Sequence, residues 1–209
     1  MEIASHDALI VIDVQNDFCP GGTLAVADGD AVIEPIHRLA VKFDHILLTQ
    51  DWHPAGHSSF ASAHAGKVPF KQIEMSYGAQ TLWPDHCVQG SWGAEFHPAL
   101  QLTMAELILR KGFRREVDSY SAFFENDRMT ATGLGGYLRG RGLTRLFLAG
   151  LAYDFCVGYS ALDAQRLGFE AIVLRDACRP IDLNGSLQNI ETDFARAGVL
   201  LMESAEILG

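Results

Sequence analysis

The sequence predicts a three-layer, doubly wound α/β fold with a mostly parallel sheet and helices on both faces. Short apolar runs recur along the chain, and most are nearly continuous rather than alternating. Amphipathic stretches of helix length stand between them. Uninterrupted apolar strands are typical of parallel sheets covered on both faces. The 209 residues are 48% hydrophobic and 20% charged, so the chain can bury a full core.

Six apolar runs are expected to form the strands and four stretches to form helices. In chain order the strand candidates are residues 8–13, 45–49, 107–111, 146–149, 171–174 and 198–202. The helix candidates are residues 30–43, 130–141, 154–167 and 184–197. Three of these helices open on Asp or Asn, which favour N-caps because their side chains accept hydrogen bonds from free N–H groups.

Residues 52–102 break this rhythm, because they are rich in His, Pro, Gly and aromatic side chains and show little periodicity. A long irregular insertion in a compact domain usually carries function. No repeat, low-complexity tract or linker divides the chain. We therefore expect one domain over residues 1–209, with this insertion contributing to a metal site.

The composition excludes several classes of protein. Lys and Arg number 16 against 26 Asp and Glu, and the net charge of −10 includes no basic block for nucleic acid or an anionic membrane. The first residues are acidic and no apolar run approaches a membrane span, so a cytoplasmic protein is expected. The sequence leaves a homo-oligomer open. The cysteines are far apart and form no Cys-x-x-Cys pair, which predicts free thiols at Cys19, Cys87, Cys156 and Cys178.

Reactive side chains stand near the carboxyl ends of the predicted strands, where open parallel sheets bind ligands. Cys156 lies at the start of a predicted helix, whose N–H groups and dipole stabilise a thiolate. Asp13 can accept the thiol proton and Lys111 can hold that carboxylate. Arg110 and Lys111 point to opposite faces of their strand, so only one can enter the site. Taken singly, a buried thiol, a turn Asp and a solvated Lys are ordinary; together the three favour a nucleophilic site.

A second set of side chains has the composition of a metal site. Asp51 and His53 are two residues apart, so both face one way on an extended segment. With His86 they make a set of two His and one carboxylate, which suits zinc, iron or manganese. An Asp-x-His pair alone is common and carries little information. Cys87 adjoins His86, and we interpret it as a buried thiol.

Five motifs in order along the chain carry a family resemblance. They occupy residues 11–18, 51–57, 83–90, 110–112 and 150–157. In them the sequence resembles the cysteine-hydrolase superfamily of nicotinamidases and isochorismatase-like proteins, over essentially its whole length. The resemblance implies a catalytic triad of Asp13, Lys111 and Cys156, and a cis peptide bond between Leu151 and Ala152.

The resemblance also implies how a substrate is held. The backbone N–H groups of Ala152 and Cys156 would form an oxyanion hole. The resemblance implies that His57 is either a further metal ligand or a neighbour of the site, and we leave His57 outside the ligand set. The residues implied in substrate binding are Phe18, Trp83, Tyr120, Leu151 and Ala152.

The metal set is typical of nicotinamidases within that superfamily. The resemblance implies hydrolysis of nicotinamide to nicotinate and ammonia in NAD salvage, through a Cys156 thioester. A divalent metal, zinc first and iron or manganese as alternatives, would hold the pyridine nitrogen. The substrate implied is nicotinamide or a pyrazinamide-like aromatic amide. Two alternatives stay open: a related isochorismatase-like amidase acting on another small amide, or a catalytically silent binding module. The intact Asp13, Lys111 and Cys156 argue against the silent module.

Overall fold

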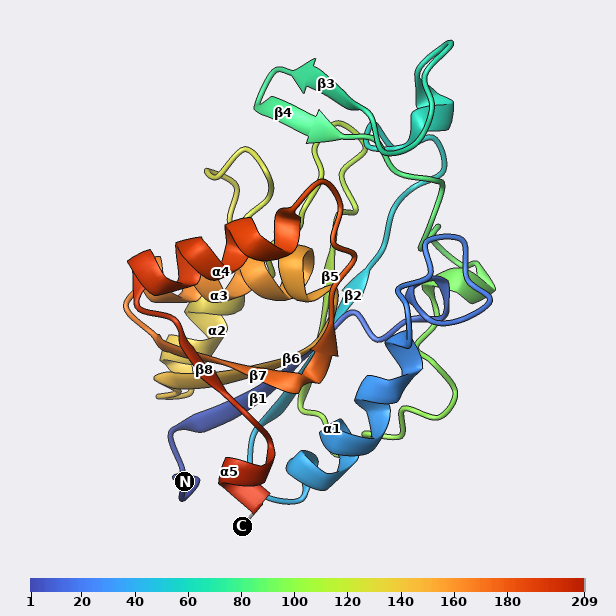
Figure 1. Ribbon diagram of the computed structural model, residues 1–209. Coiled ribbons are helices and arrows are strands. Elements are labelled where there is room, and N and C mark those ends of the chain that lie inside the picture. The colour runs from blue at the N-terminus through green and yellow to red at the C-terminus, as the bar shows by residue number, and fades with distance from the viewer. Residues whose placement is uncertain (209) are drawn as a thin grey trace.

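The chain folds around one parallel six-stranded sheet, shown by a computed structural model that describes residues 1–208 (Figure 1). Neighbouring strands are parallel throughout, so the predicted fold class is confirmed. All six predicted strands are present, with ends shifted by a few residues. Their order across the sheet is β5 (Leu107–Lys111), β2 (Ile46–Asp51), β1 (Asp7–Ile12), β6 (Arg145–Leu151), β7 (Glu170–Arg179) and β8 (Leu200–Met202).

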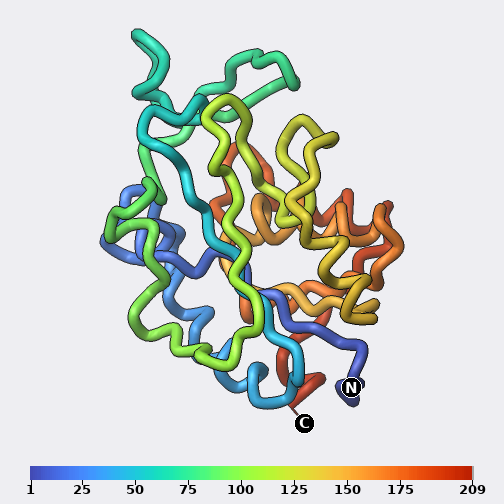
Figure 2. Tube along the Cα trace, turned by 180° about the vertical axis from the view of Figure 1, so that it is seen from behind, coloured from blue at the N-terminus to red at the C-terminus, as the bar shows by residue number. Residues whose placement is uncertain are grey.

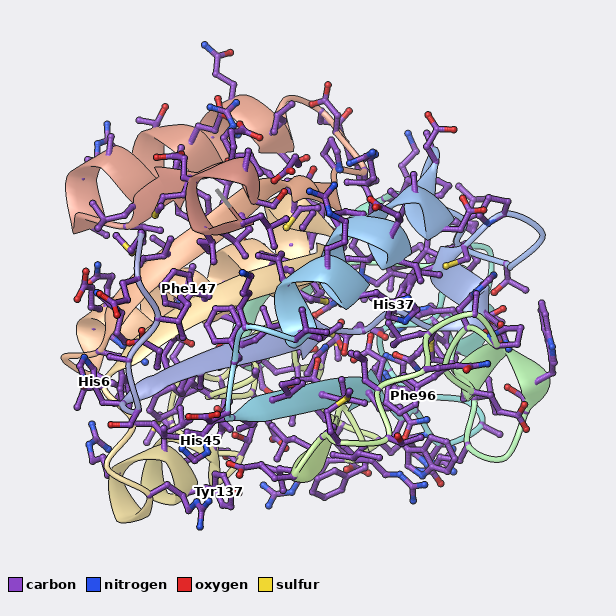
Figure 3. All side chains as sticks on the ribbon, turned by 90° about the horizontal axis from the view of Figure 1, so that it is seen from below. His6, His37, His45, Phe96, Tyr137 and Phe147 are labelled. Carbon is purple, nitrogen blue, oxygen red and sulfur yellow. The ribbon has the colours of Figure 1, made fainter. Side chains whose placement is uncertain are left out.

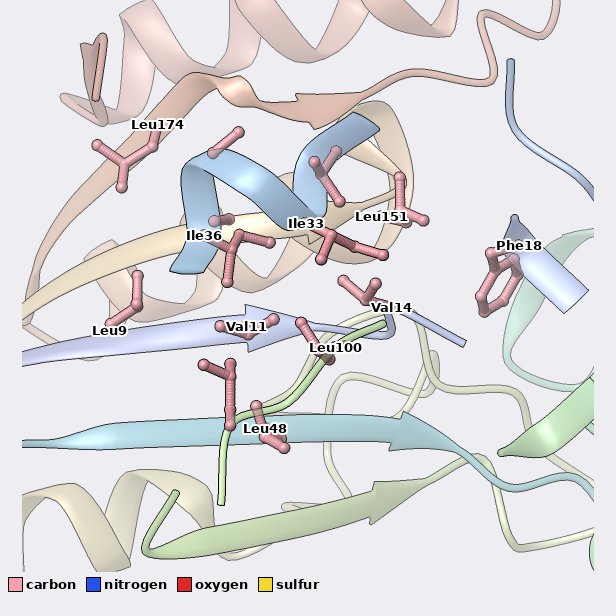
Figure 4. Close-up of a cluster of buried hydrophobic side chains, with 14 of the residues drawn as sticks. Leu9, Val11, Val14, Phe18, Ile33, Ile36, Leu48, Leu100, Leu151 and Leu174 are labelled. Carbon is pink, nitrogen blue, oxygen red and sulfur yellow. The ribbon is translucent and has the colours of Figure 1, made fainter. Parts of the chain in front are cut away.

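Helices cover both faces of the sheet because side chains of the central strands alternate between two cores. Val11 of β1 faces α1 (Ile33–Ala40), and Figure 4 shows it among Leu9, Ile33 and Ile36. Ile10, the preceding residue, lies in the opposite core. The helices of that second core are α2 (Leu134–Gly140), α3 (Gly158–Arg166) and α4 (Ser186–Ala197), while α5 (Ala205–Leu208) joins α1 on the first. None of the helices in residues 1–208 has both the length and the apolar character needed to cross a membrane.

The predicted acidic and amide N-caps are wrong. The residues at the N-cap positions of α1, of the η5 turn (Tyr153–Val157) and of α4 are Val32, Ala152 and Gly185, and none caps with a side chain. Asp154 has another use: its carboxylate accepts hydrogen bonds from the N–H groups of Ile181 and Asp182 and from the Ser186 hydroxyl. It therefore ties the loop before α4 to the turn that follows β6.

The insertion between β2 and β5 is more regular than the sequence suggested. It contains an antiparallel hairpin of β3 (Gln72–Met75) and β4 (Gly78–Thr81), and two short helices, η3 (Ala61–Ala63) and η4 (Trp92–Ala94). Seen from behind in Figure 2, the chain rises from β2 to this hairpin, which stands clear of the sheet. Strands of four residues are too short to give a clear alternating pattern.

The amino ends of β2 and β5 are joined by a polar cluster far from the predicted site. Glu106 accepts hydrogen bonds from Tyr137 and Arg141 and pairs with His45 (3.0–3.1 Å), and Figure 3 labels His45 and Tyr137. The cluster ties α2 to the amino end of the edge strand β5, at the other end of the strands from the predicted site.

Candidate active site

Asp13, Lys111 and Cys156 meet at the carboxyl end of the sheet. Asp13 follows β1, Lys111 ends β5, and Cys156 lies in η5 directly after β6. The Lys111 Nζ atom lies 2.8 Å from Asp13 Oδ2 and 3.4 Å from Cys156 Sγ. All three residues are buried. Topology explains the convergence, because the three strands are parallel and close together in the sheet.

The Asp13 carboxylate has one oxygen anchored and one oxygen directed at the reactive groups. Its Oδ1 accepts a hydrogen bond of 2.6 Å from the Thr49 hydroxyl, and Thr49 in turn accepts one from the Asp13 N–H. Its Oδ2 pairs with the Lys111 ammonium, and no other group of the described residues donates a hydrogen bond to it. The second oxygen is therefore free to take a proton from a neighbouring thiol.

Lys111 also donates hydrogen bonds to two residues outside the group of Asp13, Lys111 and Cys156. Its Nζ donates to Asp51 Oδ1 at 2.5 Å and to the Ser119 carbonyl at 2.9 Å. Arg110, the preceding residue, points away: its guanidinium stacks over Trp52 at 3.8 Å. The alternation predicted for this strand end is thus present, and Lys111 is the charge that enters the site.

Burial dominates the protonation of the cluster. It raises the pKa of the Cys156 thiol well above its usual value, with Lys111 opposing and Asp13 reinforcing the shift. It also raises the pKa of Asp13, although Lys111 opposes this. Asp13 and Asp51 together raise the pKa of Lys111 despite burial. The resting cysteine is therefore a thiol, contrary to the thiolate expected from its helix-start position, because desolvation outweighs the helix N-terminus.

The turn after β6 presents backbone donors beside Cys156. The peptide bond between Leu151 and Ala152 is cis, as the resemblance implied. The Ala152 carbonyl accepts from the N–H groups of Phe155 and Val157, both at 3.1 Å. Outside helices and strands, the backbone hydrogen bonds of the described residues do not use the N–H groups of Ala152 or Cys156. Of the two, Ala152 lies outside every helix and strand, so its N–H is without a backbone acceptor in this turn.

Asp51, His53 and His86 form a compact, buried cluster next to Lys111. The Nε2 atoms of His53 and His86 lie 3.6 and 3.8 Å from Asp51 Oδ2. Each Nδ1 lies 2.8 Å from a backbone carbonyl, of Gly112 for His53 and of Pro84 for His86. These carbonyls fix the tautomer, so both imidazoles turn Nε2 toward one point.

This donor set fits a divalent metal ion. One ligand atom from each of the three residues lies within 4.8 Å of the others, and two imidazoles with a carboxylate suit zinc, iron or manganese. Burial and the neighbouring His53 charge lower the pKa of His86 to about 4, so its Nε2 lone pair is available at neutral pH. A divalent metal site is therefore supported, while the donors accept several ions.

Asp51 links the metal cluster to the nucleophile cluster. Its Oδ1 accepts from Lys111 and its Oδ2 faces the two histidines. Gln15, which the sequence did not single out, clamps the Asp51 backbone: its Nε2 donates to the Asp51 carbonyl and its Oε1 accepts from the Asp51 N–H, both at 2.8 Å. Its place two residues after Asp13, in a motif shared with the family, was the available signal.

His57 is held by the protein through both ring nitrogens. Its Nε2 lies 2.8 Å from the Arg114 carbonyl, and its Nδ1 accepts the Ser59 N–H at 3.2 Å. The ring stacks beside His53, with centroids 4.3 Å apart. A nitrogen that already donates to a carbonyl cannot also bind a metal, so His57 is a supporting neighbour in this geometry.

A pocket connects the two clusters, since it is lined by Asp51 and His86 from one and by Cys156 from the other. Of the residues expected to bind substrate, it is lined by Phe18, Trp83, Tyr120 and Ala152. Leu151 is instead fully buried in the hydrophobic core, so its expected contact with a substrate is not supported. Four further lining residues were not predicted: Leu24, Asp118, Phe155 and Ile181. Of these, only Phe155 lies in a motif shared with the family, at residues 150–157.

Aromatic rings form one wall of this pocket. Trp83 meets Phe155 edge to face with centroids 5.0 Å apart, and Tyr120 meets Phe155 at 5.6 Å. Phe18 packs against His86, with centroids 5.5 Å apart, and both line the pocket. The pocket therefore offers flat apolar surfaces between a thiol and a metal-binding cluster, an arrangement suited to a small planar ring.

Comparisons with known proteins agree with this geometry. The isochorismatase domain family matches residues 7–205. A curated nicotinamidase of Acinetobacter baylyi is 54% identical over 208 residues, covering 100% of this chain and 97% of that protein. The structure of PnC1 from L. infantum in complex with nicotinate has a TM-score of 0.86 and 37% identity, covering 99% of this chain and 98% of the other. The zinc complex of Pyrococcus horikoshii pyrazinamidase has a TM-score of 0.76 and 33% identity, covering 95% and 99%.

Proposed function

This chain belongs to the isochorismatase family, and we propose that it hydrolyses nicotinamide to nicotinate and ammonia with Cys156 as the nucleophile. One observation carries the proposal: a single pocket joins the cluster of Cys156, Lys111 and Asp13 to a metal-binding cluster across aromatic walls. A cysteine hydrolase needs the cluster of Cys156, Lys111 and Asp13. A planar amide with a ring nitrogen would use the other two features, because the metal-binding cluster could hold the nitrogen and the aromatic walls could hold the ring.

The first step transfers a proton and forms a covalent bond. Asp13 Oδ2 takes the proton of the Cys156 thiol while the sulfur attacks the carboxamide carbon. The raised pKa of buried Asp13 makes it a stronger base than an ordinary aspartate. Lys111, bonded to Asp13 and 3.4 Å from the sulfur, stabilises the negative charge while it moves between them.

The tetrahedral intermediate places an oxyanion beside the turn after β6, where it accepts hydrogen bonds from the N–H groups of Ala152 and Cys156. Asp13 returns its proton to the amide nitrogen, the C–N bond breaks, and ammonia leaves a Cys156 thioester. Asp13 then takes a proton from a water molecule, which attacks the thioester carbon. The C–S bond breaks, the sulfur regains the proton from Asp13, and the released nicotinic acid loses its remaining carboxyl proton to water to give nicotinate.

Asp51, His53 and His86 would hold the divalent metal, which when bound supplies a Lewis-acidic anchor for the ring nitrogen. The protein itself does the rest of the positioning. The aromatic wall of Trp83 and Phe155 orients the ring, and the carboxamide then extends toward Cys156.

We further propose that the reaction serves NAD salvage in the cytoplasm. The four cysteines are free and buried in the structure, and such thiols suit a reducing compartment. The substrate class is a small aromatic amide, and a pyrazinamide-like ring fits the same planar pocket.

The proposal is tested by ammonia release from nicotinamide by the purified, metal-loaded protein. Cys156→Ala is expected to abolish turnover, while Cys178→Ala, which removes another buried thiol, keeps it. Turnover by the Cys156→Ala variant would remove the thioester mechanism. Turnover of another amide without nicotinamide would refute the substrate, and inactivity on every amide with no selective iodoacetamide labelling of Cys156 would favour a binding module.

A further inference from the structure

Gln80 of the β4 strand is a fully buried amide behind the pocket wall, and all its polar atoms are bonded. Its Nε2 lies 2.7 Å from the Thr81 carbonyl, 2.8 Å from Asp118 Oδ2 and 3.1 Å from the Tyr120 hydroxyl, and its two hydrogens are shared among these three acceptors. Its Oε1 accepts from the Tyr77 hydroxyl and Asn126 Nδ2, at 3.1 and 3.2 Å. The residue does not line the pocket itself.

The surroundings allow only one orientation of this amide. A flipped Gln80 would direct its carbonyl oxygen at the Thr81 carbonyl and the Asp118 carboxylate, both acceptors. The donor side is thus fixed toward Asp118 and Tyr120, and the acceptor side toward Tyr77 and Asn126. Hydrogen bonds to a buried amide that has only one orientation also hold its partners in fixed positions.

Two of the partners line the pocket. Tyr120 is held at both ends, because its N–H donates to Asn126 Oδ1 at 3.0 Å and its hydroxyl also accepts from Trp83 Nε1 at 3.1 Å. Asp118 lies 4.0 Å from His53 and accepts the Ser119 N–H through Oδ1, so Gln80 is its side-chain donor within the described residues. Losing Gln80 would remove one of the two donors to the Tyr120 hydroxyl and, at the same time, the side-chain donor to the buried Asp118 carboxylate.

We propose that Gln80 is a positioning residue that fixes Tyr120 and Asp118, and through them the ring plane of the bound amide. The inference rests on the proposed function, since it names a residue that prepares the same pocket. It also assigns a role to the hairpin of the insertion: β3 and β4 carry Gln80 to the site.

The test compares Gln80→Leu with wild type and with Gln72→Leu, a matched change at an exposed position of the same hairpin. We expect Gln80→Leu to raise the KM for nicotinamide and the Kd for nicotinate about tenfold, the size of one buried hydrogen bond lost to a charged acceptor. The rate of iodoacetamide labelling of Cys156 should stay unchanged, because Gln80 bonds to none of Asp13, Lys111 and Cys156. Gln72→Leu should match wild type.

A second pair of variants separates positioning from folding. Gln80→Glu keeps the size of the side chain but sets a carboxylate against Asp118, so its KM should exceed that of Gln80→Leu. Combining it with Asp118→Asn restores a donor and an acceptor in reversed order, and KM should fall back toward the value of the Asp118→Asn single variant. A purely structural role would change the melting temperature without this recovery.

The outcomes distinguish this inference from the proposed function. Wild-type KM and nicotinate Kd in a folded Gln80→Leu variant would overturn the role of Gln80 and leave the reaction standing. A wild-type protein that binds nicotinate but releases no ammonia would refute the reaction, and the Kd of Gln80→Leu would still decide the role of Gln80. Failure of the wild type to bind nicotinate would overturn both.

Discussion

The replacement Lys111→Met tests whether one buried ammonium holds the site together. The Lys111 side chain is fully buried and pairs with Asp13 and Asp51 at 2.8 and 2.5 Å. Methionine fills a similar volume but leaves two carboxylates without their shared cation. Breaking a buried ion pair from one side costs about 3–5 kcal/mol, because the remaining charge stays desolvated. We expect the free energy of unfolding to fall by that amount at pH 8.

The loss should depend on pH in a defined direction. Without Lys111, the pKa of buried Asp13, already raised, rises further above the unfolded value of about 3.9. The folded variant then holds a proton that the unfolded chain has released, so its stability falls as pH rises through that interval. The deficit against wild type should therefore be small near pH 4 and full once pH exceeds the folded pKa of Asp13. In the wild type the raised pKa of Lys111 keeps its contribution at neutral pH, and that contribution is lost only above about pH 10.4.

Urea unfolding of the metal-free proteins, followed by tryptophan fluorescence at pH 5 to 8, measures this deficit. With a urea slope of about 2–3 kcal/mol per M, the midpoint should move by about 1–2.5 M at pH 8. Lys42→Met is the control, because Lys42 is exposed and is expected to shift the midpoint little. A Lys111→Met variant as stable as Lys42→Met at pH 8, or a deficit that shrinks as pH rises, would refute the reasoning.

Three further predictions concern the site. Asp13→Asn should lower turnover by about 10²–10⁴-fold, because the base is lost. The same variant should shift iodoacetamide labelling of Cys156 to lower pH, because Asp13 raises the pKa of the thiol. Labelling that moves to higher pH would contradict this reasoning. Gly112→Ala should weaken metal binding about 10–100-fold, because a Cβ there would overlap the His53 ring, whereas Gly66→Ala has a similar positive φ and open space and should bind metal normally in a zinc titration. His57→Ala should retain one metal per chain by elemental analysis and His86→Ala should lose it, and the reverse result would place His57 in the ligand set.

The six strands and their positions along the chain could be predicted from the sequence, because an apolar run is a local property. Residues 107–111 show this well: the run predicts the strand, and alternation predicts that Arg110 and Lys111 separate. Helix starts were less predictable, because Asp154 is a good N-cap by type but bonds to a loop about 30 residues later. The hairpin that carries Gln80 was missed because its strands are only four residues long.

By itself, the sequence determined which side chains stand at the carboxyl ends of parallel strands, and hence that Asp13, Lys111 and Cys156 share one edge of the sheet with Asp51. Only the tertiary structure decided how they are used: that Asp51 divides its two oxygens between Lys111 and the histidines, and that His57 is already bonded to the protein. The protonation of Cys156 also belongs to the tertiary structure. A helix start is visible in the sequence, whereas desolvation depends on every residue packed around the thiol, and burial is the larger effect.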